Sequence, residues 1–114
     1  MFDTDGVKVS KGLLDALVAR QGVLSNNLAN LETEGYIRQD VDFSRVLTDL
    51  KNEVGNADTS TSIARATYKD ESKPMTIESE LSKLYENHLR YILMVKSVGN
   101  HYEHMKKALE VRAQ

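Results

Sequence analysis

The sequence predicts an all-α-dominated fold, in which two long terminal helices pack as an antiparallel coiled-coil hairpin around an irregular polar middle segment. Three observations indicate this fold. Apolar residues recur in steps of three and four through the first third of the chain and again through the last third, which is the pattern of a heptad seam. The segment between them is polar and rich in turn-forming residues. A length of 114 residues suits one domain with a modest core.

The N-terminal helix is expected at about residues 8–31, within an N-terminal unit of residues 1–35. Gly35 lies just beyond the helix, where a left-handed cap or turn is wanted. The seam has one polar member and consists of Leu14, Leu17, Gln21, Leu24, Leu28 and Leu31. This spacing places all six side chains on one face of the helix.

Residues 36–75 are expected to form the irregular middle segment. The stretch KNEVGNADTSTS is polar, and Gly55-Asn56 is its strongest bend signal. Residues 63–68 suit a short strand.

The C-terminal unit, residues 76–114, contains the stronger helix signal. Pro74 marks its start, Thr76 is the expected N-cap, and Glu78 and Glu80 suit the positive end of the helix dipole. The heptad series here is unbroken and consists of Ile77, Leu81, Leu84, His88, Tyr91, Val95, Val98, Tyr102, Met105 and Leu109. Residues 91–95 are apolar all round the helix, and one partner helix cannot bury every side of such a segment. We therefore expect contacts with other chains.

Composition excludes several functional classes. A net charge of −2 argues against nucleic-acid binding, which requires a basic excess on one face. The sequence has no apolar run long enough for membrane insertion and begins without a signal-peptide pattern. Cysteine is absent, so disulfides and thiolate metal sites are excluded.

Candidate chemistry is sparse. His101 and His104 could place two imidazoles on one helix face, but the sequence fixes no third metal ligand. His88 interrupts the seam and is better interpreted as a polar residue that sets register in an interface. Asp40 and Asp42 resemble a carboxylate pair, although a salt bridge or solvated surface is the better interpretation. We predict no catalytic, cofactor or metal site, and a small metal-dependent enzyme that uses the histidines is the alternative.

Two separated segments resemble one known family. The run ARQGVLSNNLANLETEGYIRQDVDFSRVL resembles the N-terminal signature of flagellar rod and hook axial proteins, whose motif is Ala-Asn, two variable residues, Thr-Pro-Gly and an aromatic residue. The matching residues are Ala29, Asn30, Thr33, Gly35 and Tyr36. Glu34 stands where the motif has proline, so the turn must rely on Gly35.

The second segment, MTIESELSKLYENHLRYILMV, is similar to the C-terminal helix of a proximal rod subunit. Arg20-Gln21 and the residues Asp40–Phe43 also favour a proximal subunit over a neighbouring rod subunit, which is the second interpretation. The resemblance covers roughly residues 13–47 and 75–110 and leaves the middle of the chain unmatched.

The resemblance implies a non-enzymatic structural subunit that polymerises into the helical rod of the flagellar basal body, with both terminal helices in its inner layer. The three units would then form one inner domain of an axial protein. The residues expected at the assembly interface are Leu14, Leu17, Leu24, Leu28, Leu84, Tyr91, Val95, Val98 and Tyr102. Asn26, Asn27 and Asn30 would supply directional hydrogen bonds where the chain leaves that layer, or they would serve only as local caps.

The expected partners are further copies of the chain, neighbouring rod proteins, the adaptor to the MS ring and the export gate. The expected location is the rod in the periplasmic space, reached by type III export without a cleaved signal peptide. A self-contained helical-hairpin adaptor or export chaperone is the alternative from a different functional class.

Overall fold

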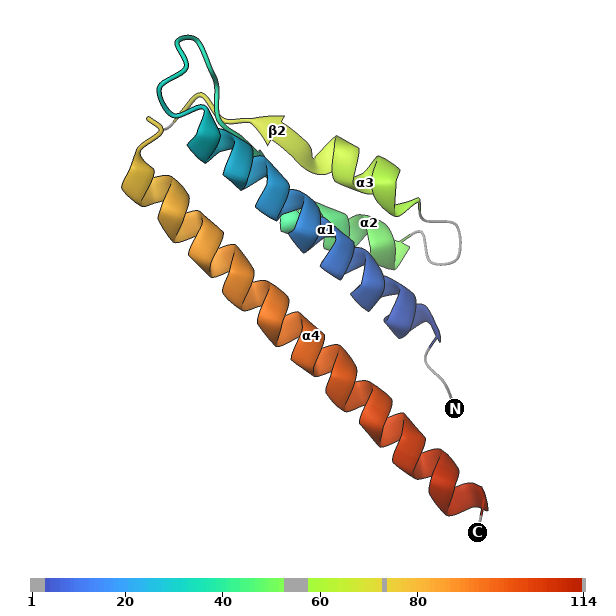
Figure 1. Ribbon diagram of the computed structural model, residues 1–114. Coiled ribbons are helices and arrows are strands. Elements are labelled where there is room, and N and C mark those ends of the chain that lie inside the picture. Colours follow the sequence, from blue (N-terminus) through green and yellow to red (C-terminus); the bar gives the residue numbers. More distant parts are fainter. Residues whose placement is uncertain (1–3, 53–57, 73, 114) are drawn as a thin grey trace.

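The computed structural model describes residues 4–52, 58–72 and 74–113. In chain order the elements are α1 (Thr4–Ala29), β1 (Gln39–Val41), α2 (Phe43–Asn52), α3 (Thr59–Ala66), β2 (Thr67–Lys69) and α4 (Ile77–Ala113). Figure 1 shows α1 and α4 side by side in opposite directions, and α2 and α3 both pack on α1. The predicted helical hairpin is therefore confirmed. At roughly 1.5 Å per residue, α4 is on the order of 55 Å long, and its C-terminal part extends past the start of α1 (Figure 1).

The predicted helix boundaries hold at the hairpin's closed end. The Thr76 hydroxyl oxygen accepts a hydrogen bond from the Ser79 N–H at 3.1 Å, so Thr76 caps α4 as expected. Gly35 has a φ of +79°, the left-handed conformation that favours glycine. Beyond α1, the Thr33 carbonyl accepts a 3.2 Å hydrogen bond from the Tyr36 N–H. The turn thus forms on Gly35 without the proline of the family motif.

The middle segment is more regular than predicted. It contains two short helices and a two-stranded antiparallel ladder in which Asp40 pairs with Tyr68. Asp42 caps the start of α2, since its carboxylate accepts a 3.2 Å hydrogen bond from the Arg45 N–H. Asp58 caps α3 in the same way by accepting from the Ser60 N–H. These caps and the i,i+4 spacing of apolar residues outweigh the turn-like composition. The predicted strand at 63–68 is α3 up to Ala66 and becomes strand only at 67–69. The predicted bend at Gly55-Asn56 lies outside the described residues.

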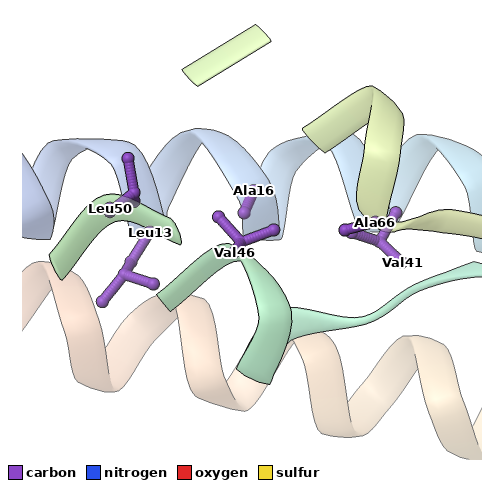
Figure 2. Close-up of a cluster of buried hydrophobic side chains, with 6 residues drawn as sticks. All are labelled: Leu13, Ala16, Val41, Val46, Leu50 and Ala66. Carbon is purple, nitrogen blue, oxygen red and sulfur yellow. The ribbon is translucent and has the colours of Figure 1, made fainter. Parts of the chain in front are cut away.

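The apolar core lies between α1 and the middle segment. Figure 2 shows its six buried side chains, which come from α1, β1, α2 and α3: Leu13, Ala16, Val41, Val46, Leu50 and Ala66. Gly12 brings α1 close to α2, because a Cβ atom at this position would lie 2.5 Å from a methyl carbon of Leu50. From α4, Met94 packs against this cluster. One side of α1 is thus covered by the middle segment.

The α4 heptad series does not point straight at α1, as a simple seam would require. The α4 side chains that are buried against α1 include Glu80 and Asn87, which lie beside the predicted series. Leu81 and Val95 of the series remain exposed along one flank. Compared with the orientation that its apolar series predicts, α4 is rotated about its axis. Its buried polar side chains find hydrogen-bond partners only when they face α1 and the chain around β1.

Candidate functional site

The seam between α1 and α4 is built around a set of buried polar side chains, which we call the polar cluster. Arg20 and Asn27 come from α1, Arg38 and Asp40 from β1 and the residue before it, and Glu80 and Asn87 from α4. Each is less than a tenth exposed. Buried polar groups are stable only when they are paired, so their partners define what the cluster does.

Arg20 and Asp40 form a buried bidentate ion pair. Arg20 Nε donates to Asp40 Oδ1 at 2.7 Å, and Arg20 Nη2 donates to Oδ2 at 3.3 Å. The Val41 N–H also donates to Asp40 Oδ1, at 2.7 Å. Burial opposes ionisation of Asp40, but the hydrogen bonds from Arg20 and Val41 and the charges of Arg20 and Arg38 outweigh it. The pKa of Asp40 is therefore lowered. This pair fixes β1 against α1.

Arg38 joins three parts of the chain. Its Nε donates to Glu80 Oε1 at 2.6 Å, and its Nη1 donates to Asp70 Oδ2 at 3.0 Å. Its Nη2 lies 3.7 Å from Asp40 Oδ2, within ion-pair distance. Burial lowers the pKa of Arg38. The hydrogen bond to Glu80 and the charges of the three carboxylates raise it by more, so the pKa of Arg38 is raised overall. The guanidinium therefore stays charged and ties α4 to the middle segment.

The asparagines near the end of α1 divide into two roles. The Asn27 amide donates to the Gln39 carbonyl at 2.7 Å and to Glu80 Oε2 at 3.2 Å. Its oxygen accepts from the Gln39 N–H at 2.9 Å and from the Tyr36 hydroxyl at 3.2 Å. Asn30 instead caps its own helix, because it donates to the Asn26 carbonyl at 2.8 Å and accepts from the Thr33 hydroxyl. Asn27 makes the directional tertiary hydrogen bonds, and Asn30 is a local cap.

The family motif therefore forms the corner that closes α1. Ala29 is exposed at the last position of the helix, and Asn30, Thr33 and Gly35 shape the turn. Tyr36 returns the chain to the hairpin through its hydrogen bond to Asn27. The corner's function in this chain is to deliver Arg38 and Asp40 into the seam.

The side of the hairpin away from the middle segment carries an exposed apolar surface. We call this the open face and define it by Val18 of α1 and Leu81, Tyr91 and Val95 of α4. A groove of about 290 Å³ runs between the two helices here, and Val18, His88 and Tyr91 are among its lining residues. Leu81 and Val95 lie one heptad to either side of His88, so they follow the same flank of α4.

The residues predicted at an assembly interface are not equally accessible. Leu17 and Leu24 are 1% and 0% exposed, so they are packed inside the chain and leave no surface for a neighbour in this conformation. Tyr91, Val95 and Tyr102 are exposed, Tyr102 by 64%. The others are partly buried: Leu14, Leu28, Leu84 and Val98.

The histidines do not form a site. His88, His101 and His104 are all exposed on α4. Within the part of the chain that the structure describes, no three His, Cys, Asp or Glu side chains are placed to hold a metal ion.

None of the helices that the structure describes is long and apolar enough to cross a membrane. The sequence indicated Asp40 as a possible salt bridge, but it did not reveal that Arg20 and Arg38 are its partners.

Asp40 should make stability depend on pH. Because its pKa is lowered in the folded chain, the ionised carboxylate stabilises the fold above the unfolded-state pKa of about 3.9, and this contribution is lost as pH falls through the folded-state pKa. Asp40→Asn should lower the free energy of unfolding by roughly 2–4 kcal/mol at neutral pH. The difference from wild type should shrink below about pH 4. Urea unfolding across a pH series measures it, with Asp15→Asn at an exposed position of α1 as control. A loss that did not vary with pH would contradict the ion-pair explanation.

The comparisons with known proteins agree with the resemblance found in the sequence. The family described as flagella basal body rod protein matches residues 14–36, which comprise the second half of α1 and the motif corner. No curated protein matches the chain. The match confirms the resemblance to the flagellar rod family, and it does not distinguish one rod subunit from another.

Proposed function

From the family match at residues 14–36, we propose that this chain is a structural subunit of the flagellar basal-body rod, of the proximal FlgB type. That match is the observation that carries the proposal. The finer assignment rests on RQDVDF at residues 38–43 and on Glu86, Asn87 and Arg90, which resemble that subunit. Three of these residues, Arg38, Asp40 and Asn87, belong to the polar cluster, so the resemblance falls partly on residues that hold the hairpin together.

The geometry supports assembly with other chains. The open face offers exposed apolar side chains on both helices, and contiguous apolar surface is typical of a protein interaction site. The C-terminal part of α4 adds more, since Tyr102, Leu109 and Val111 are all exposed where α4 extends past α1. The open face and the C-terminal part of α4 are different surfaces. A contact that joins the open face of one copy to the C-terminal part of α4 in the next copy is therefore heterologous. Heterologous contacts that do not close into a ring produce a helical filament, which is the architecture of a rod.

The polar cluster supports a structural role over a catalytic one. Each of its charged side chains is held in an ion pair, Arg38 also with Asp70 outside the cluster, and each is more than nine-tenths buried. A substrate could not reach them without opening the hairpin. We therefore assign no catalysis to the cluster. The subunit would be exported to the periplasmic rod and would contact further copies of itself, neighbouring rod subunits, the adaptor to the MS ring and the export gate.

The alternatives are a neighbouring rod subunit of the FlgC type and a helical-hairpin adaptor or export chaperone. The internal polar cluster is the observation that favours the adaptor, because it allows a hairpin to be folded and self-contained without neighbours.

The proposal is tested by locating the chain in the bacterium that encodes it. Basal bodies are purified from wild-type cells and from cells that lack the gene, and their proteins are identified by mass spectrometry. We expect the chain in wild-type basal bodies, and basal bodies without a rod in the deletion strain. A chain that stays in the cytoplasm, bound to export cargo, would replace the rod assignment with the chaperone. Crosslinking within the purified rod separates the two rod positions, because a proximal subunit contacts the adaptor to the MS ring.

A further inference from the structure

We propose that the polar cluster sets the register of α1 against α4, so that the hairpin adopts one alignment out of several that its apolar residues would allow. Four cross-helix hydrogen bonds carry this inference. The Asn27 amide of α1 donates to Glu80 Oε2 of α4 at 3.2 Å. The Asn87 amide of α4 donates to the Leu17 carbonyl and to Gln21 Oε1 of α1, both at 2.9 Å. Arg20 Nη1 also donates to Asn87 Oδ1 at 3.4 Å.

These contacts are spaced by one heptad on both helices. Arg20 and Asn27 are one heptad apart on α1, and Glu80 and Asn87 are one heptad apart on α4. The next step along the seam is apolar, since Leu13 lies in the core cluster against which Met94 packs. From the closed end of the hairpin, the successive facing positions of the seam are therefore polar, polar and apolar. A uniform leucine seam would look the same after a slip of one heptad, whereas this one does not.

A slip by one heptad is unfavourable in either direction. In one direction Arg20 would face Met94, and Glu80 would move away from Arg38, which would lose its shortest ion-pair contact. In the other direction Glu80 would lose Arg38 and move to the position of Asn87, where it would share Arg20 with Asp40, so two carboxylates would be buried around one guanidinium. Asn87 would then face Leu13 without a partner for its amide. Of these alignments, only the observed one gives each side chain of the cluster a hydrogen-bond partner.

The two α1 members of the cluster also have partners outside α4. Arg20 is held by Asp40, and Asn27 is held by the backbone of Gln39. Replacing the α4 members with apolar residues therefore leaves Arg20 and Asn27 each with a partner, while Arg38 Nε and Arg20 Nη1 lose their acceptors. Arg38 keeps Asp70 and Asp40 as ion-pair partners. Apolar substitutions at the α4 positions can therefore remove the contacts that set the register while the fold is retained.

The experiment measures the alignment of the two helices directly. The chain has no cysteine, so Ser25→Cys and Ser97→Cys place two nitroxide spin labels at exposed positions of α1 and α4 without background. Pulsed electron resonance on dilute protein then gives the label-to-label distance. A slip of one heptad moves α4 by roughly 10 Å along α1 and changes this distance by nearly as much.

In this labelled background we expect one distance for the otherwise unchanged chain. The variant Glu80→Met/Asn87→Leu should remain helical and give a second distance, displaced by roughly 10 Å, in more than about a tenth of the molecules. Leu84→Met is the matched control: it lies on the same helix between the two polar positions and exchanges one apolar residue for another, so it should keep the single distance.

A folded double variant with the single native distance would overturn the proposal, because the connection between β2 and α4 would then suffice to set the register. If the double variant fails to fold, Asn87→Leu alone decides the question, since it keeps the ion pair of Glu80 with Arg38. This variant should show the second distance in a smaller fraction of molecules. Its absence there would equally overturn the proposal. None of these outcomes depends on whether the chain enters a rod.

Discussion

Arg38→Met should be the most destabilising single substitution in the polar cluster. Arg38 gives Glu80 its closest ion-pair contact, at 2.6 Å, and Glu80 is 0% exposed. Removal of the guanidinium leaves a carboxylate buried in the seam, with the Asn27 amide as its remaining side-chain hydrogen-bond partner among the described residues. Breaking a buried ion pair on one side costs roughly 3–5 kcal/mol, because the remaining charge keeps its desolvation penalty. We expect a loss of that size in the free energy of unfolding, measured by urea titration and circular dichroism.

The chain offers a matched control on the same long helix. Arg90 and Glu86 form an ion pair at 2.8 Å, but both side chains are about half exposed. Water screens such a pair, so Arg90→Met should change the free energy of unfolding by no more than about 0.5 kcal/mol. The double variant Arg38→Met/Glu80→Leu should recover part of the loss, because both charges are removed together. Equal losses for Arg38→Met and Arg90→Met would show that burial does not determine the strength of these ion pairs.

The sequence predicted the parts of the fold that depend on local signals. The heptad steps predicted both long helices, Thr76 predicted the start of α4, and Gly35 predicted the left-handed turn. These features are determined within one or two turns of chain, so a single sequence is enough to find them. The hairpin was predicted because both helices carry a long apolar series, although in the structure α4 also turns Glu80 and Asn87 toward α1.

The short helices of the middle segment were missed for a physical reason. Asp58 precedes a run of threonine and serine, which is typical of a turn when taken alone. The helix α3 forms because Asp58 caps it and because Ser62 and Ala66, one turn apart, are buried. The Ser62 hydroxyl is held by Asp49 of α2 at 3.0 Å. That contact is tertiary, and no local pattern contains it.

The polar cluster was only partly visible in the sequence for a similar reason. Glu80 was interpreted as a favourable charge at the start of a helix, and Asp40 as one of two carboxylates in a salt bridge or on a solvated surface. Their real partners are Arg38 and Arg20, which are far away in the sequence. One signal was available: Arg20 and Asn27, like Glu80 and Asn87, repeat at one heptad on helices that are otherwise apolar at that spacing. Polar residues that follow the heptad period indicate a polar seam as well as an apolar one.

Val95→Asp should prevent incorporation into the rod without unfolding the free chain. Val95 is 43% exposed on the open face, so a carboxylate at this position remains hydrated in the isolated subunit. We expect the free energy of unfolding to change by about 0.5 kcal/mol or less. If a neighbouring chain covers the open face in the rod, the same carboxylate would be buried without a partner, at a cost of several kcal/mol. The expected result is a folded subunit that is absent from purified basal bodies.

Ser97→Asp is the control because it adds the same charge to the same helix. Ser97 is exposed and lies on the other flank of α4, where it lines a groove with Phe43 and Met94. We expect this variant to be incorporated, because the open face is unchanged. Quantitative mass spectrometry of basal bodies from the two strains compares them, and unfolding of the two purified subunits removes instability as an explanation. Normal incorporation of both variants would show that the open face is not an assembly interface. Loss of both from the rod, with both subunits folded, would show that neighbours surround α4 on both flanks, as the apolar residues at 91–95 would then require.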